Sequence, residues 1–557
     1  MDMSSDKGPG TSDLPPSYFD YPDDKLFIYS HIAIMTLSWV FALPIAVMMS
    51  LARSRYTLPA QLIFLASNGL GMFVGIVYNG KTPDLYPNNA HHKIGWIITV
   101  VVCVHVFLSV LDTATGFMRR DGGKGAYQGL RSYMPSRLSS TGSRQGSSDA
   151  QPHRASYDSG HGTDGVTESL RSNSVSTLAE NRPLRLEEGE QGFDEEESLT
   201  DVEFTRESRP SRWHGWVNKM PMGIFRRGSR AFGLWYDIID RVILPFGFVA
   251  FTTGIATFGR FFEGHGIFSG LAHWIKGGVF FWVGVLTLGR WSGAFGDLGW
   301  AWNLRPKKNS QKWQPSSEFV ESFMIFAYGS TNIFLEHLGG AGGPWTAQDL
   351  EHVSITVLFI GGGLCGMLIE STKIRDLLNT TTSDAAELDE AIQEMVHTDV
   401  EKAGTLETPD SYGVSLNPIP ALVIILLGMM MSSHHQSSMV STMVHEQWGN
   451  LLVGAGLARG LTYVVLYLKP PQSVLPSRPP TELLASFGLI AGGVIFMASS
   501  HDTVVGMENR NLDAMFMYTV TMGLVGLLMA WILFVLALKG WAVRREAARM
   551  ARSHKLT

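Results

Sequence analysis

The most regular feature of this sequence is a series of apolar runs about 20 residues long, the length of helix that crosses the hydrocarbon core of a bilayer. Polar segments separate the runs. The predicted spans are residues 28–50, 60–78, 93–113, 242–262, 266–288, 319–338, 351–370, 417–434, 446–468, 482–500 and 515–538. The pattern predicts an all-α, polytopic membrane protein with about eleven transmembrane helices.

A long polar stretch, residues 116–230, divides the predicted spans into two groups. It is rich in Ser, Arg and Glu and has too few large apolar residues to fold alone, so we expect a disordered loop. Its end alternates basic residues with Trp and Phe, a pattern typical of an interfacial segment. The resulting parts are an N-terminal tail (1–27), a three-helix module (28–115), the loop (116–230), an eight-helix domain (231–541) and a basic tail (542–557).

The distribution of Lys and Arg predicts the orientation in the membrane. Under the eleven-span count, Arg53 and Arg55, the start of the long loop, the segment 303–313 and the C-terminal tail all fall on one side. Basic loops favour the cytosol, which places the acidic N-terminus outside or in a lumen. We expect a multi-pass protein of the plasma membrane or an endomembrane, in contact with lipid. No nucleic-acid-binding pattern is present.

The long loop carries two motifs that basophilic kinases use. "RASYDS" begins at Arg154 and "RSNSVS" at Arg171, and both place serines two or three residues after arginine. Kinases are therefore expected partners, with the alternative that these are ordinary solvated serines of a linker.

Histidines and acidic residues gather where the spans of the second group end on the outer side. The stretch "SSHHQSSMVSTMVHE" (432–446) lies between two spans, and two further hairpins repeat the arrangement. His265 and His273 belong to the same level. The predicted metal-ligating residues of this outer rim are Glu336, His337, Glu351, His352, His434, His435, His445, Glu446, His501 and Asp502.

Three chemistries are open for this rim. Imidazole and carboxylate groups suit a divalent metal such as zinc or iron, and the nearby methionines would favour copper. The histidines could instead relay protons, because imidazole titrates near neutrality. A hydrogen-bonded polar cap that closes the helix bundle is the third reading. The only two cysteines, Cys103 and Cys365, lie inside apolar runs, which excludes a disulfide framework.

The first and third spans each begin with histidine. Both descend from the same side, so His31 and either His91 or His92 share a depth and can be the axial ligands of a b-type haem. His105 lies fourteen residues after His91 and so on the same helix face, but its partner position on the first span is Ile45. We expect His105 to hydrogen-bond within the bundle or to serve a redox pair not visible in the sequence.

These three spans resemble the cytochrome b-561 superfamily in His31, Trp39, Pro44, Arg53 and the segment from His91 to Gly95. The resemblance implies a cofactor site that includes His31, His91, His92 and Arg53. The superfamily's second histidine pair is missing from spans 60–78 and 242–262, so at most one haem is implied, near the outer face. A haem-free scaffold is the alternative.

The order of parts resembles a fungal family of integral membrane proteins named after a yeast transmembrane protein, with a b-561-like N-terminal domain and a characteristic C-terminal domain. The motifs that carry the likeness are "FLEHLGG", "DLEHVSITVLFIGGGLCGMLIES", "SSHHQSSMVSTMVHE" and "VIFMASSHDTVVGMENRNLDAMFMY". The resemblance covers nearly the whole chain outside the long loop. It implies an architecture and no substrate.

Two features within the spans predict packing. The glycines of "FIGGGLCG" (359–366) indicate close helix contact. Arg459 lies deeper than a rim charge should, and Glu482 is a partner for it.

The function we expect is redox chemistry with one haem, or metal handling, at the outer face. An electron donor or a metal ion would then be the partner, and an enzyme of this kind would be a membrane oxidoreductase of b-561 type. The alternative is a non-redox transporter or a scaffold regulated by phosphorylation of the loop.

Overall fold

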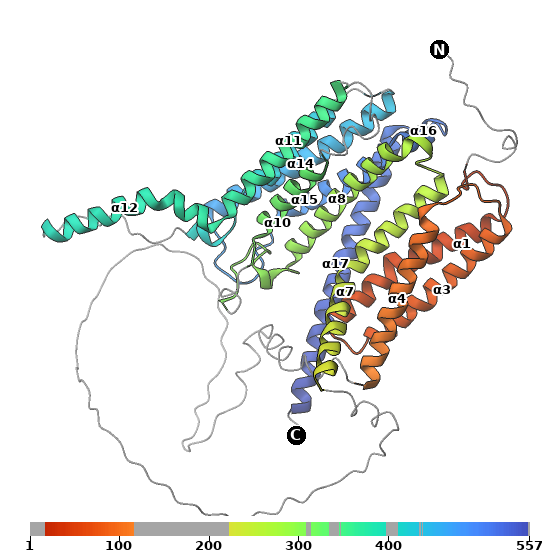
Figure 1. The fold of residues 1–557 in the computed structure, drawn as a ribbon, viewed down its shortest axis with the longest axis horizontal. Helices are drawn as coiled ribbons and strands as arrows, with labels where there is room; N and C mark the ends of the chain where they lie inside the picture. Colours follow the sequence, from red (N-terminus) through yellow and green to blue (C-terminus); the bar gives the residue numbers. More distant parts are fainter. Residues whose placement is uncertain are drawn as a thin grey trace, which may run out of the picture. The chain divides into compact units, whose positions relative to one another are not determined.

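The structure is a computed structural model that describes residues 17–115, 222–307, 314–332, 345, 347–396, 410–433, 436 and 438–554. Every regular element in these ranges is a helix (Figure 1). The predicted phosphorylation motifs lie outside them, as does most of the predicted loop, although α7 begins within it at Met222.

Within the described ranges, nine helical runs are long and apolar enough to cross a membrane. They are α1 to α2 (Lys25–Leu51), α3 (Thr57–Lys81), α4 (Ala90–Thr115), α7 (Met222–Gly259), α8 (Ile267–Ser292), α11 (Ala347–Glu370), α14 (Met439–Leu468), α15 (Pro480–Ala498) and α17 (Ala514–His554). Two shorter helices, α10 (Ser317–Asn332) and α13 (Ile419–Ser432), match the other two predicted spans. The prediction of an all-α, polytopic membrane protein is confirmed.

The first run changes its helical period in the middle. Between α1 (Lys25–Thr36) and α2 (Leu43–Leu51), the segment η1 (Leu37–Ala42) is a π-helix. Pro44 follows two residues after its end, and proline cannot donate the backbone hydrogen bond of a regular helix. A π-helical insertion of this kind often accompanies a functional site. Here it lies between His31, near one end of the run, and Arg53, just past the other.

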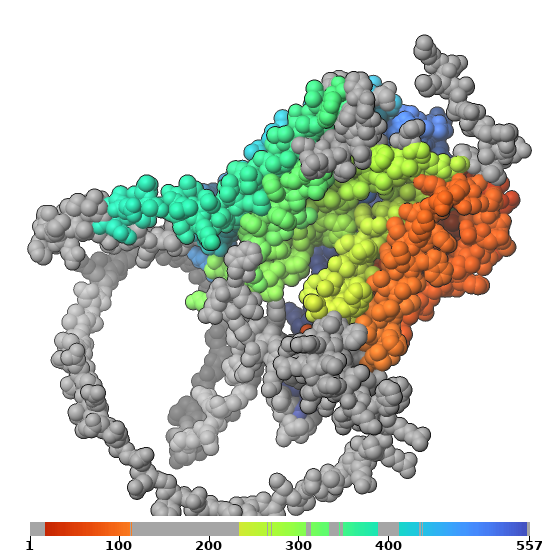
Figure 2. All heavy atoms as spheres, viewed as in Figure 1, coloured from red at the N-terminus to blue at the C-terminus, as the bar shows by residue number. Residues whose placement is uncertain are grey.

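The N-terminal spans pack with α7 as a fourth helix, and we call these four the N-terminal module. Their shared core contains Leu43, Val47, Phe64, Ile98, Val102, Val106, Ile239, Ile243 and Ala250. The ring of Phe248 on α7 also stacks on Phe281 of α8, with centroids 4.8 Å apart. In Figure 2 the yellow-green atoms of α7 accordingly lie beside the orange atoms of the first spans. Helix α7, which the sequence analysis groups with the second set of spans, thus packs against both sets.

Helix α15 is the most buried of the apolar runs and packs against α8, α14 and α17. Glycines allow the closest approach: a Cβ added to Gly493 would lie 2.6 Å from the carbonyl oxygen of Gly277 on α8. The glycines of the 359–366 segment do the same between α11 and α10, where a Cβ on Gly363 would lie 2.5 Å from the Phe326 nitrogen. Close packing through small residues is thus confirmed.

The outer faces of the helices are apolar. Ile63, Leu70 and Phe73 of α3, for example, expose more than half of their surface. A soluble domain rarely shows such faces, whereas a bilayer covers them. Helix α12 (Thr372–Val396), between α11 and α13 in the chain, is more polar and projects away from the bundle in Figure 1.

Candidate functional site

His31 and His91 lie against each other at one end of the N-terminal module, which we call the His31 end. Their ring centroids are 6.4 Å apart and the ring planes are nearly perpendicular, at 80°. His31 comes from α1 and His91 from the first turn of α4. The sequence predicts that the two residues lie at the same depth, and in the structure their rings are in contact.

Hydrogen bonds to the other two helices of the module fix both rings. Nδ1 of His31 lies 2.8 Å from the Gly71 carbonyl oxygen on α3, and Nδ1 of His91 lies 3.1 Å from the Ala250 carbonyl oxygen on α7. A carbonyl only accepts, so each Nδ1 carries the proton and donates it. Each Nε2 then keeps its lone pair, which is the arrangement usual for metal-ligating histidines.

Glycines provide the space for both rings. A Cβ on Gly75 would lie 2.7 Å from Nδ1 of His31, and one on Gly254 would lie 3.1 Å from Cε1 of His91. Any larger residue at Gly75 would displace the His31 ring, because real Cβ atoms do not approach so closely. The sequence gives no sign of these two positions, since each glycine contacts a histidine from a distant part of the chain.

The separation of the rings fits two imidazoles on opposite sides of one metal. With metal–nitrogen bonds of about 2.0 Å and ring centres about 1.1 Å beyond each nitrogen, the centroids would be about 6 Å apart. Edge-to-face ring packing gives a similar distance. No group of three or more His, Cys, Asp or Glu side chains able to hold a metal occurs among the described residues. Two imidazoles alone suit a haem, whose ring supplies the other four ligands, better than a bare zinc ion, which takes three or four protein ligands.

The other two residues of the predicted cofactor site lie elsewhere. His92 is exposed, and its backbone N–H donates to Asn89 Oδ1 at 3.1 Å. Arg53 is exposed beyond the end of α2, with a φ of 49°. It is 22 residues from His31 along a nearly continuous helix, or about 30 Å. The pair His31 and His91 is therefore the part of the predicted site that the structure assembles.

The outer rim is only partly visible, because Glu336, His337, His434 and His435 lie outside the described residues. Glu351, Glu446 and His501 are exposed, and His352 is half-buried. The described members of the rim form no three-residue metal site. The role of these residues as metal ligands stays a prediction.

One pair at this level does form inside the C-terminal domain, by which we mean the helices from α8 onward. His273 on α8 and His445 on α14 have ring centroids 5.9 Å apart, with planes at 88°. His445 is 6% exposed, and its Nδ1 bonds the Ser441 carbonyl at 2.8 Å. Both residues sit beside Phe496 or Trp448. The sequence placed both histidines at one level but gave no reason to pair them.

Asp502, another predicted metal ligand, accepts a backbone hydrogen bond that connects two segments of the chain. Its Oδ2 accepts the backbone N–H of Phe262 at 2.6 Å, which ties helix α16 (His501–Glu508) to the segment after α7. The Tyr86 hydroxyl donates to the carbonyl of Phe261 in the same segment, at 2.7 Å. Burial raises the pKa of Tyr86 above its usual value, and the nearby carboxylates of Glu263 and Asp502 add to the effect.

A buried charge network lies within the C-terminal domain, at the end away from the outer rim. Arg290 Nη2 is 2.7 Å from Glu318, and its Nη1 is 2.9 Å from Glu321. Arg459 Nη1 lies 3.3 Å from Glu321, and its Nε lies 2.8 Å from Glu482. The predicted partnership of Arg459 with Glu482 is confirmed, and Glu321 connects it to a second arginine. The network joins α8, α10, α14 and α15.

Two protein-family models match this chain, one in each half. A family model described as "Protein YTP1-like, C-terminal" matches residues 246–540. A model described as a domain of unknown function (DUF2427) matches residues 12–115. Both halves therefore have relatives, and the first match alone covers more than half of the chain.

Among individual relatives, an uncharacterized membrane protein of Schizosaccharomyces pombe (C3B8.06) is 33% identical over 93% of this chain and 95% of its own length. An uncharacterized membrane protein of Saccharomyces cerevisiae (YCR061W) is 42% identical over 56% of this chain and 48% of its own. Protein YTP1 of the same yeast is 23% identical over 34% of this chain and 32% of its own. The chain therefore belongs to the YTP1-like family of fungal integral membrane proteins.

Proposed function

We propose that the N-terminal module binds one b-type haem between His31 and His91 and exchanges electrons at the His31 end. The observation that carries this proposal is the pair of half-buried imidazoles, with ring centroids 6.4 Å apart and each Nδ1 bonded to a backbone carbonyl. Each Nε2 keeps its lone pair, and two such nitrogens would hold a haem with no third protein ligand.

Each residue of the site has a defined task in this proposal. Nε2 of His31 and Nε2 of His91 would hold the iron, and a bound haem would supply one-electron redox chemistry. The carbonyls of Gly71 and Ala250 hold the tautomer of each ring, and they raise the basicity of the ligand nitrogens by accepting the Nδ1 protons. Gly75 leaves the space in which the His31 ring lies.

The position of the site limits what it can do. It lies at one end of helices that span about 30 Å of hydrocarbon, so a single haem there cannot carry an electron across the membrane. We therefore propose an electron donor or acceptor at the same face. The basic loops at the opposite end favour an outer or lumenal position for that face.

The proposal is tested by the haem and iron content of the purified full-length protein and of two glycine variants on α3. We expect one haem per chain in the wild type, and loss of most of it in Gly75→Ala, whose Cβ would lie 2.7 Å from His31 Nδ1. Gly80→Ala is the matched control, since nothing lies within 4 Å of its added Cβ. A wild type without haem, or equal content in the two variants, would contradict the proposal.

Metal handling at the outer rim is a second proposal, favoured by the His273–His445 pair. Two imidazoles from α8 and α14 can begin a transition-metal site that further rim residues complete. Zinc, iron and copper analysis of the purified protein, with and without His445→Ala, tests it. A metal content that is unchanged in the variant would exclude this pair as ligands.

For a protein that binds neither a haem nor a metal, the alternative function is that of a non-redox transporter or of a scaffold regulated by phosphorylation of the long loop.

A further inference from the structure

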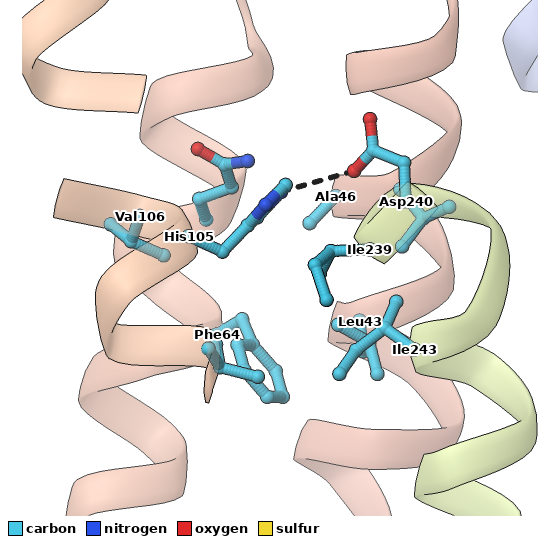
Figure 3. Close-up of a pocket in the computed structure, with 11 residues that line it drawn as sticks. Leu43, Ala46, Phe64, His105, Val106, Ile239, Asp240 and Ile243 are labelled. Atoms are coloured by element: carbon cyan, nitrogen blue, oxygen red, sulfur yellow. Dashed lines mark ion pairs between the residues drawn. The ribbon is translucent and has the colours of Figure 1, made fainter. Parts of the chain in front are cut away.

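A second buried polar centre lies in the N-terminal module, at the opposite end from His31. His105 Nε2 on α4 is 3.1 Å from Asp240 Oδ1 on α7 (Figure 3). The other carboxylate oxygen of Asp240 accepts from the Ser50 hydroxyl at 2.5 Å. The ring of Tyr236 stacks on the imidazole, with centroids 4.1 Å apart. His105 and Asp240 are 6% and 4% exposed, so this is a buried pair with defined geometry.

A cavity of about 20 Å³ adjoins this pair. Both His105 and Gln61 line it, and each has a buried polar atom that makes no hydrogen bond: Nδ1 of His105 and Oε1 of Gln61. A water molecule needs about 10–15 Å³ of such space and two or more polar partners. One water therefore fits the cavity, and its two hydrogens can satisfy both atoms.

The contacts suit an ionised Asp240. Its two oxygens then accept from the Ser50 hydroxyl and from a proton on His105 Nε2. With a neutral imidazole, Nδ1 accepts a hydrogen from the water and the centre carries one uncompensated negative charge. With a second proton on Nδ1, the imidazole donates to the water, which still donates to Gln61, and the centre is a neutral ion pair. An apolar membrane interior favours the neutral arrangement.

The other groups around the centre do not compete with His105 for the second proton. Tyr236 is its other titratable neighbour, and the Tyr236 hydroxyl accepts from Gln61 Nε2 at 3.0 Å. Helices α2 and α3 contribute only neutral polar groups, Ser50 and Gln61. Arg241, next to Asp240 in the chain, is exposed and donates to the Asp237 carbonyl of its own helix. Among the described residues that line the cavity, His105 is the one basic group.

We propose that His105, Asp240 and one water in this cavity form a proton-binding site, filled from the Arg53 end of the module. Ser50 lies in the last turn of α2 and Gln61 near the start of α3, so the polar side of the centre faces that end. Toward the His31 end the cavity is closed by Phe64, Leu43 and Val102, which are 1%, 4% and 3% exposed. The site shares no residue with the His31–His91 pair and does not require a bound haem.

The test is solid-state NMR of the full-length protein, labelled with nitrogen-15 at histidine and held in lipid nanodiscs. The signals of His105 are assigned by their loss in His105→Gln. At a fixed pH we expect the wild-type His105 to carry a proton on both ring nitrogens, the ion pair that an apolar interior favours. In Asp240→Asn the doubly protonated fraction at a fixed pH should fall at least about tenfold, because the carboxylate that favours the charged form is gone.

Two further variants make the outcome decisive. His92→Gln, an exposed histidine on the same helix, should leave the His105 signals unchanged. Gln61→Leu leaves the water with one polar partner, too few to hold it. The charged imidazole then loses a stronger hydrogen bond than the neutral one, so the doubly protonated fraction should fall about fivefold. This second variant serves if Asp240→Asn does not fold. A wild-type His105 with a single N–H, or a doubly protonated fraction that is unchanged in Asp240→Asn or Gln61→Leu, would overturn the proposal.

Discussion

Replacing Arg459 by methionine should destabilise the C-terminal domain severely. The guanidinium lies 2.8 Å from one oxygen of Glu482 and 2.9 Å from the other, and it also bonds Glu321 at 3.3 Å and Thr287 at 3.2 Å. Glu482 is 0% exposed, so the variant leaves a buried carboxylate without its cation. Breaking a buried ion pair in this way costs about 3–5 kcal/mol of unfolding free energy.

The double variant Arg459→Met, Glu482→Gln separates lost charge balance from lost packing. It removes the unpaired carboxylate, and Glu321 keeps its bond to Arg290 at 2.9 Å. We therefore expect the double variant to recover most of the loss, to within about 1–2 kcal/mol of the wild type. Arg544→Met, at an exposed position on α17, is the matched control and should change stability by less than about 0.5 kcal/mol.

The assay is unfolding of the purified full-length protein by SDS in mixed micelles, followed by circular dichroism. The reasoning is refuted if the unfolding free energy of Arg459→Met lies within about 1 kcal/mol of the wild-type value, because most single substitutions cause a change of that size. It is also refuted if the double variant is no more stable than the single one, because the unpaired carboxylate would then not be the cause.

Two further predictions concern packing and pH. Gly493→Ala should lower the free energy of unfolding by about 1–3 kcal/mol, because its Cβ would lie 2.6 Å from the Gly277 oxygen and push α15 away from α8. Gly526→Ala on α17 is the control, since its Cβ meets nothing within 4 Å. Equal unfolding midpoints for the two variants would contradict this prediction. Burial raises the pKa of Tyr86, so its neutral phenol stabilises the fold at pH values below about 10 and this stability is lost as the pH rises further. Tyr86→Phe should therefore lose less stability than the wild type between about pH 9 and pH 11, as measured by thermal unfolding; an equal loss would exclude Tyr86 as a cause.

Length and hydropathy were sufficient to predict the helices, because each apolar run must satisfy its own backbone within the bilayer. The same constraint made the depth of His31 and His91 predictable, since depth follows from position along a span. Depth alone does not identify neighbours around a bundle. The pairing of His273 with His445 and the packing of α7 as the fourth helix of the module depend on how helices rotate and associate, which the sequence of one helix does not encode.

A buried ion pair could be predicted from the sequence only where one of its charges lies in the middle of an apolar run. Arg459 lies in the middle of an apolar run, so a carboxylate partner had to exist and Glu482 was in reach. Arg290 and Glu318 looked like ordinary residues at span ends, yet they are 2% exposed. The partner of His105 could not be found because it was sought on the first span, whereas Asp240 comes from α7, beyond the long loop.

The most direct test of the central claim is the reduced-minus-oxidised absorption spectrum of the purified full-length protein and three histidine variants. The account predicts a sharp reduced α-band in the wild type and in His92→Ala, whose side chain is exposed beside the pair. The band should be lost in His31→Ala and in His91→Ala, because either change removes one of the two residues that would hold the haem. A featureless wild-type spectrum, or a band that survives His31→Ala, would contradict the assignment of this pair as a haem site.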